Sequence, residues 1–165
     1  MPVLLRARTA AVLPLALVAV LVASLLAFTP SASAMTRSNR IGLGLDITRH
    51  QEGDPYRYGA AGPNRFDCSG LVYFSYRRAG FRHIPRTAAE QARHMRRISR
   101  RHLRRGDFVF FYSGRARSWN VYHVGVFAGW HHGHRVMIDA PHTGSRVHRE
   151  RIWSNHWFAG TLRGL

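Results

Sequence analysis

The single cysteine of the chain, Cys68, lies where the residue pattern predicts the start of a helix. Asp67 is a favourable N-cap residue, and apolar side chains recur after it at helical spacing until Gly80. Backbone N–H groups at a helix N-terminus carry partial positive charge, which favours the thiolate form of a nearby cysteine. The thiolate is the reactive form, so the segment indicates a nucleophile. A buried structural cysteine, a common role for a free thiol, is the alternative.

A histidine and an aspartate that could serve this thiol lie in the second half of the chain. Residues 121–128 and 135–140 alternate as strands do, and a hairpin with its turn centred on His131 would join them. In that register His123 lies directly opposite Asp139, with Cβ atoms about 5 Å apart. Apolar side chains alternate with His123, so the imidazole and Asp139 should share one face of the sheet.

These three residues are of the types that form a nucleophilic triad. The parts required are a thiolate, a histidine that accepts and returns its proton, and a carboxylate that orients the imidazole ring. The sequence therefore predicts a catalytic site of Cys68, His123 and Asp139. His142 is close enough in the chain to be the second choice for the orienting residue. The alternatives are a hydrogen-bonded edge histidine at position 123 and a strand-end hydrogen bond at Asp139.

The elements that must position these residues change character halfway along the chain. Residues 46–52 are weakly helical, and Thr87 with Glu90 has the spacing of a capping box that opens another short helix. Four stretches with strand character follow, over residues 108–112, 121–128, 135–140 and 145–149. Helices that precede an antiparallel sheet predict an α+β domain with its N-terminal helices packed on the sheet.

Residues 1–34 have the pattern of a secretory signal peptide. Arg6 and Arg8 precede an apolar run over residues 10–28, and small residues in an Ala-x-Ala pattern end the segment. The apolar run is also about long enough to span a bilayer, so an uncleaved membrane anchor is the alternative.

The rest of the chain is expected to form a short lead-in over residues 35–47 and one catalytic domain over residues 48–165. Export places this domain outside the cytoplasmic membrane, either secreted or associated with the cell wall. An exported chain with one cysteine has no internal disulfide, so its stability must come from packing, and the free thiol needs a function.

The charge balance is strongly basic. All 25 basic residues are arginine, against 8 acidic residues, and the formal net charge is +17. Six of the arginines lie within residues 96–105, where a solvated basic loop is the alternative to a binding surface. The expected partners are anionic wall polymers or lipid head groups rather than a specific nucleic acid. The histidines around His131 have no matching cluster of further metal ligands, so we expect no metal site. We also expect no cofactor, and we expect the protein to be a monomer.

Six ordered motifs resemble those of the NlpC family of cell-wall cysteine peptidases, which have a compact papain-like fold. The resemblance covers residues 55–147, and it rests on Pro55-Tyr56-Arg57-Tyr58-Gly59, Phe66-Asp67-Cys68-Ser69-Gly70-Leu71-Val72, Pro85-Arg86-Thr87, Gly106-Asp107-Phe108-Val109-Phe110-Phe111, His123-Val124-Gly125-Val126 and Ile138-Asp139-Ala140-Pro141. The family usually has histidine where this chain has Asp139, and an aspartate is chemically competent to orient the ring.

The resemblance implies that Cys68 is the nucleophile and His123 the base, and that Tyr56 and Ser69 line the site. Arg86 matches a family arginine beside the cleft and is a candidate partner for a substrate carboxylate. The implied reaction is hydrolysis of a peptidoglycan stem peptide, most often between the γ-carboxyl of D-glutamate and meso-diaminopimelate. The alternatives are an amidase or acyltransferase on the same fold, and a non-catalytic cationic protein that binds the wall or a membrane.

Overall fold

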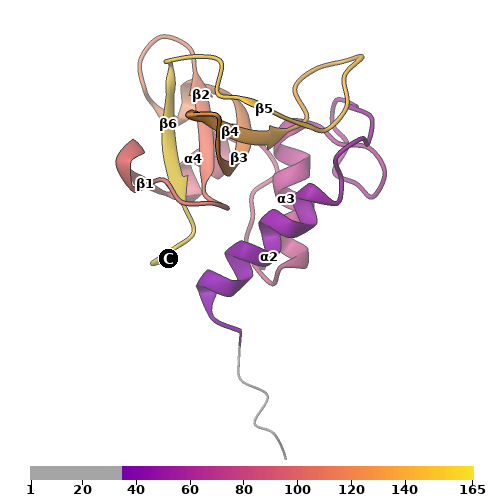
Figure 1. Ribbon diagram of the computed structural model, residues 1–165, viewed down its shortest axis with the longest axis horizontal. Helices are drawn as coiled ribbons and strands as arrows, with labels where there is room; N and C mark the ends of the chain where they lie inside the picture. Colours follow the sequence, from indigo (N-terminus) through magenta and orange to yellow (C-terminus); the bar gives the residue numbers. More distant parts are fainter. Residues whose placement is uncertain (1–34) are drawn as a thin grey trace, which may run out of the picture. The chain divides into compact units, whose positions relative to one another are not determined.

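The computed structural model describes residues 35–165, in which helices precede strands (Figure 1). The predicted signal peptide, residues 1–34, lies outside the described residues. The helices are α2 (Arg37–Arg49), α3 (Cys68–Arg78) and α4 (Ala88–His94). The strands are β1 (Arg96–Ile98), β2 (Phe108–Tyr112), β3 (Val121–His131), β4 (His134–Asp139), β5 (His148–Arg151) and β6 (Trp157–Thr161). Within residues 35–165, no helix has the length and apolar character needed to cross a bilayer.

The strands form one antiparallel sheet in the order β1-β6-β2-β3-β4-β5. Figure 1 shows α2 and α3 side by side, and both α3 and α4 contact β3 near the middle of the sheet. The predicted α+β fold, with N-terminal helices packed on an antiparallel sheet, is therefore confirmed.

The predicted starts of α3 and α4 are also confirmed. The Asp67 carboxylate accepts a hydrogen bond of 2.6 Å from the backbone N–H of Gly70 and caps α3, so that Cys68 is the first helical residue. Thr87 and Glu90 form a reciprocal capping box at the start of α4. These local contacts fix where the sulfur of Cys68 lies relative to the sheet.

The lead-in expected over residues 35–47 is wrong, because most of it belongs to α2. This helix buries Ile41, Gly44, Leu45 and Thr48. Gly44 lies so close to Tyr76 of α3 that a Cβ atom there would stand 2.7 Å from the aromatic ring. A glycine that weakens the helical pattern in the sequence thus allows the two helices to pack closely.

The two faces of β3 pack into different cores. Val124 and Val126 belong to the main core, which the helices cover. Phe127 points to the other face and belongs to a smaller core with Val109, Phe111, Met137, Trp157 and Ala159. His123 follows the alternation of Phe127, as the sequence predicts, so its ring lies on the face with the smaller core.

The hairpin between β3 and β4 has a different register from the one predicted. Its tight turn lies at His132 and Gly133, which have positive φ angles of 47° and 76°, as a two-residue hairpin turn requires. Val126 pairs with Ile138, and a bulge follows between Phe127 and Gly129. Extending this register by one residue places Asp139 beside Gly125, one diagonal step from His123, so the prediction of a directly opposite pair is wrong.

Strands β1 and β6 were not predicted, and the stretch 145–149 overlaps β5 only at its end, because β5 begins at His148. The arginine-rich segment 96–105 contains β1, which pairs with β6. Two of its arginines lie over aromatic rings, Arg97 over Phe158 at 4.3 Å and Arg100 over Trp157 at 4.2 Å. The segment is therefore partly packed on the sheet by cation–π contacts rather than forming only a solvated loop.

Candidate active site

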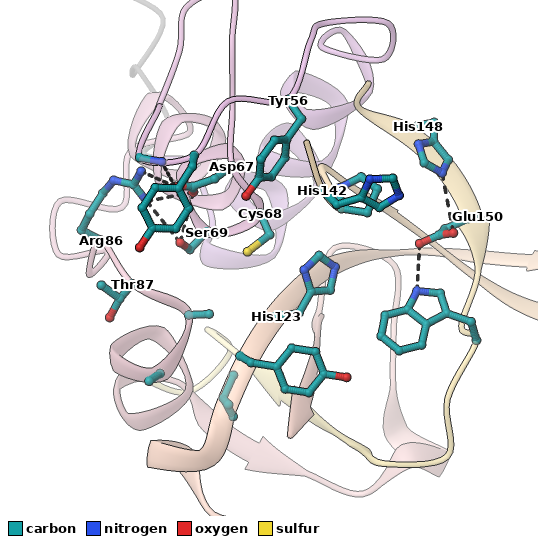
Figure 2. Close-up of a pocket in the computed structure, with 18 residues that line it drawn as sticks. Tyr56, Asp67, Cys68, Ser69, Arg86, Thr87, His123, His142, His148 and Glu150 are labelled. Carbon is teal, nitrogen blue, oxygen red and sulfur yellow. Dashed lines mark hydrogen bonds and ion pairs between the residues drawn. The ribbon is translucent and has the colours of Figure 1, made fainter. Parts of the chain in front are cut away.

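A cleft of about 910 Å³ opens at the N-terminus of α3, and Cys68 and His123 face each other across it (Figure 2). One side, which we call the loop wall, consists of lining residues within 56–69 and 86–89. The other side, which we call the strand wall, consists of lining residues within 121–123 and 141–153. The cleft thus brings together four segments that are far apart in the sequence.

The Cys68 side chain points into the cleft from the first turn of α3 toward the His123 ring (Figure 2). The residue is partly exposed and forms no disulfide. First-turn N–H groups have no acceptor within their own helix, so they place partial positive charge near the sulfur. The Cys68 sulfur thus lies at the positive end of the α3 dipole, where the sequence pattern places it.

His123 is buried and lies between Cys68 and Asp139. Its Nε2 atom is 2.6 Å from Oδ2 of Asp139, so Nδ1 is the ring nitrogen left to serve the sulfur. Burial lowers the pKa of His123, but hydrogen bonds to Asp139 and Cys68 outweigh this effect and raise the pKa to about 10. The arrangement therefore favours a protonated His123 imidazolium at neutral pH, with its Nδ1 atom left for Cys68.

Asp139 is fully buried behind His123, and among the described residues its Oδ1 atom has no hydrogen-bond donor. His142, the second choice for the orienting residue, lines the cleft, but its Nδ1 atom pairs with the carbonyl of Thr143 at 2.9 Å. The contact with His123 is therefore made by Asp139, although the strand register differs from the predicted one.

The loop wall is built around the Asp67 carboxylate. Arg86 donates to both of its oxygens, from Nη2 to Oδ2 at 2.7 Å and from Nη1 to Oδ1 at 3.0 Å. The backbone N–H groups of Gly59 and Gly70 donate to the same carboxylate. Arg86 also donates to the carbonyl of Ala60 at 3.2 Å, so its guanidinium ties the loop before α3 to the helix N-terminus. This use differs from the predicted contact with a substrate carboxylate.

Ser69 and Tyr56 both line the cleft, and Ser69 belongs to this hydrogen-bond network. The Ser69 hydroxyl donates to Oδ1 of Asp67 at 3.3 Å and accepts from Arg86 at 3.1 Å. Burial and the negative charges of Cys68 and Asp67 raise the pKa of Tyr56, which keeps its phenol protonated. Tyr56 therefore presents a neutral O–H donor near the sulfur (Figure 2).

Three residues of the strand wall were missed by sequence reasoning. Oε1 of Glu150 accepts a hydrogen bond of 2.9 Å from the indole N–H of Trp153, and Oε2 lies 3.6 Å from Nε2 of His148. Trp153 stacks on Phe111 with ring centroids 4.2 Å apart, and its ring centroid is 6.1 Å from that of His123. The strand predicted over 145–149 stops one residue before Glu150, so the pattern gave no reason to place this carboxylate in the cleft.

No group of three or more histidine, cysteine, aspartate or glutamate side chains that could hold a metal gathers within residues 35–165. His131, His132 and His134 lie at the tight turn between β3 and β4.

Residues 53–164 match the model of the NlpC/P60 family. The chain is 39% identical over 112 residues to the murein DD-endopeptidase MepH of Escherichia coli, covering 65% of this chain and 38% of that protein. It is 44% identical over 82 residues to the bifunctional muramidase/DL-endopeptidase CwlT of Bacillus subtilis, covering 47% of this chain and 23% of that protein. Among solved structures, the NlpC/P60 domain of the peptidoglycan hydrolase SagA matches with a TM-score of 0.64 at 25% identity, covering 74% of this chain and 98% of that one.

The chain spans about half or less of the length of the curated relatives that it matches. The similarity is therefore a property of one shared domain, which includes both walls of the cleft.

Proposed function

This chain belongs to the NlpC/P60 family, and we propose that it is an exported cysteine endopeptidase that hydrolyses peptidoglycan stem peptides. The observation that carries the proposal is the position of His123, whose Nε2 atom is 2.6 Å from the buried Asp139 carboxylate while its ring faces Cys68. This is the arrangement that a nucleophilic thiolate requires.

In the proposed reaction the Cys68 thiolate attacks the carbonyl carbon of the scissile peptide bond. The His123 imidazolium then gives its proton to the leaving amine, and a thioester remains on the sulfur. His123, now neutral, removes a proton from water, and the resulting hydroxide attacks the thioester and regenerates the thiol. Asp139 keeps the ring oriented and stabilises its charged form through both steps.

The negative charge that develops on the carbonyl oxygen needs donors that are in place before the reaction. The backbone N–H of Cys68, the first residue of α3, is such a donor, because it has no partner within the helix, whereas the N–H of Gly70 is used by the Asp67 cap. The protonated phenol of Tyr56 lies near the same sulfur and is a second donor. The Asp67 and Arg86 network holds the loop that carries Tyr56 against the start of α3.

For the scissile bond we propose the link between the γ-carboxyl of D-glutamate and meso-diaminopimelate. The names of the two curated relatives describe different bonds, since one is a DD-endopeptidase and the other a DL-endopeptidase. The motif resemblance and the acidic nature of stem peptides favour the γ-D-glutamyl bond in a protein with a formal net charge of +17.

We propose that the protein acts in the cell wall, after residues 1–34 have directed its export. Relatives whose names describe endopeptidases of murein or a peptidoglycan hydrolase support this location. The arginine surface would add electrostatic retention on anionic wall polymers or lipid head groups, and this binding should weaken as salt is raised.

The test is mass spectrometry of purified stem tetrapeptide after incubation with the protein lacking residues 1–34, with Cys68→Ala as the matched control. Release of L-Ala-γ-D-Glu by the wild type alone is expected. Release by both proteins would rule out Cys68 as the nucleophile. If the wild type cleaves the tetrapeptide at another position, that bond becomes the scissile bond in place of the proposed one. If it cleaves neither the tetrapeptide nor intact wall fragments, the peptidase proposal is overturned.

A further inference from the structure

Glu150 lines the cleft, and within residues 35–165 it has no arginine partner, although the chain has 25 arginines. In the same part of the chain, four carboxylates form ion pairs with arginine, namely Asp46 with Arg49, Glu52 with Arg149, Asp67 with Arg86 and Asp107 with Arg163. The nearest basic group to the Glu150 carboxylate is therefore His148, and none of the described arginines neutralises it.

The surroundings of Glu150 leave it able to accept further hydrogen bonds. Trp153 donates to Oε1 at 2.9 Å, and Nε2 of His148 lies 3.6 Å from Oε2, which is too long for a hydrogen bond. An ionised carboxylate has about four acceptor positions, so Oε2 has free capacity. Burial, followed by the negative charge of Asp139, raises the pKa of Glu150, while the hydrogen bond from Trp153 and the charge of His148 act in the opposite direction.

The indole of Trp153 adds a second feature suited to a cation. One of its faces is occupied by Phe111, which stacks on it with an interplanar angle of 12°. Trp153 also lines the cleft and remains exposed. A cation held by Glu150 would therefore meet a carboxylate and an aromatic ring that are already joined by a hydrogen bond.

The position of this pair relative to His123 identifies the part of the substrate it faces. A histidine that protonates the leaving amine must lie on the leaving-group side of the nucleophile. Figure 2 shows Glu150 and His148 on the side of Cys68 opposite to Arg86 and Ser69, and the ring centroid of Trp153 is 6.1 Å from that of His123. The leaving fragment should therefore extend along the strand wall.

We propose that Glu150, together with the indole of Trp153, binds an ammonium group on the leaving fragment of the substrate. This inference rests on the proposed function, in which the leaving residue is a diamino acid, and assigns the residues that hold its side-chain ammonium. Glu150 acts on specificity rather than on bond cleavage, because it contacts neither the sulfur nor the scissile carbonyl.

The test compares two tetrapeptides that differ by one amine, L-Ala-γ-D-Glu-L-Lys-D-Ala and the same peptide with norleucine in place of lysine. Dissociation constants are measured by calorimetry on Cys68→Ala and on Cys68→Ala/Glu150→Gln, so that no turnover occurs. We expect Cys68→Ala to bind the lysine peptide about fivefold more tightly than the norleucine peptide, as for a partly exposed ion pair. The Glu150→Gln variant should lose this preference while retaining affinity for the norleucine peptide.

The matched control is Cys68→Ala/Glu52→Gln, because Glu52 pairs with Arg149 outside the cleft and its replacement removes the same charge. This control should keep the preference for lysine. A preference that persists in the Glu150→Gln variant, or that is absent from Cys68→Ala, overturns the ammonium site. The proposed function fails separately, if the wild type cleaves neither peptide and no wall fragment, because the binding measurements do not depend on turnover.

Discussion

The two walls of the cleft treat buried negative charge in opposite ways. On the loop wall, the Asp67 carboxylate receives hydrogen bonds from two backbone N–H groups, from Ser69 and from both terminal nitrogens of Arg86. Behind the strand wall, Asp139 uses one oxygen for His123, and among the described residues its other oxygen has no donor.

This difference separates structural from chemical use of charge. A carboxylate with every acceptor occupied fixes geometry, since moving any partner leaves a costly unpaired group. A carboxylate with one partner concentrates its effect on that partner, and here the partner is the proposed general base. The comparison assigns Asp67 and Arg86 to the scaffold of the site, and Asp139 to its reactivity.

The largest effect is expected from replacing Asp139. In Asp139→Asn the amide N–H can donate to Nε2 of His123, which would leave the proton on Nδ1 facing Cys68 and block its role as a base. We expect kcat to fall about a hundredfold or more, with the fold retained. Steady-state kinetics on a stem peptide, with circular dichroism as the check on folding, measures this.

His142→Ala is the matched control for that measurement, because the Nδ1 atom of His142 pairs with Thr143 and not with His123. We expect its kcat to stay close to that of the wild type. If His142→Ala lost activity to the same degree and Asp139→Asn did not, the orienting role would belong to His142 and the contrast between the walls would fail.

A smaller effect, on stability rather than on chemistry, is expected from Arg86. The variant Arg86→Met keeps an unbranched apolar stem in place of the arginine stem and leaves the Asp67 carboxylate without its cation. Because the Arg86 side chain is 34% exposed, solvent moderates the loss, and we expect destabilisation by about 1–3 kcal/mol. Urea denaturation measures the change in the free energy of unfolding.

The control for Arg86 is Arg149→Met, which breaks the more exposed pair with Glu52 and should cost less than about 1 kcal/mol. The sequence reading of Arg86 as a partner for a substrate carboxylate makes the opposite prediction. If Arg86→Met were as stable as the wild type but raised KM for acidic peptides, Arg86 would be a binding residue and the loop wall would not be purely structural.

Features of the site that depend on local patterns could be predicted from the sequence. The Asp67 cap, the Thr87 capping box and the alternation that places His123 on one face of β3 each involve residues close together in the chain. Such contacts are set by backbone geometry over a few residues, and the sequence reports them directly.

Features that depend on packing between distant segments could not be predicted. The bulge between Phe127 and Gly129 shifts the hairpin register, and α2 is defined by the close approach of Gly44 to Tyr76. The contact between His123 and Asp139 was still predicted correctly, because a diagonal neighbour on the same face of a sheet is also within reach of a long side chain. No sequence pattern predicted the hydrogen bond between Trp153 and Glu150.

A final expected effect is a pH dependence of stability that comes from His123 on the strand wall. The pKa of His123 is raised from 6.5 to about 10 in the folded protein, so the folded state holds a proton that the unfolded state releases between these values. The stabilisation is fully present below pH 6.5 and is lost as the pH rises toward 10. The melting temperature should therefore fall over this interval.

Comparing Cys68→Ala with Cys68→Ala/Asp139→Asn isolates the contribution of Asp139, because neither variant has a thiol to titrate. Tyr56, whose pKa is also raised, is present in both variants and cancels in the difference. His148 and Glu150, whose pKa values Asp139 helps to raise, contribute to the same difference, so it reports the whole effect of the Asp139 charge. We expect the melting temperature of Cys68→Ala to fall more steeply with pH than that of the double variant in scanning calorimetry. Parallel curves would mean that the Asp139 carboxylate does not hold the proton on His123, and the functional distinction between the two walls would then lose its electrostatic basis.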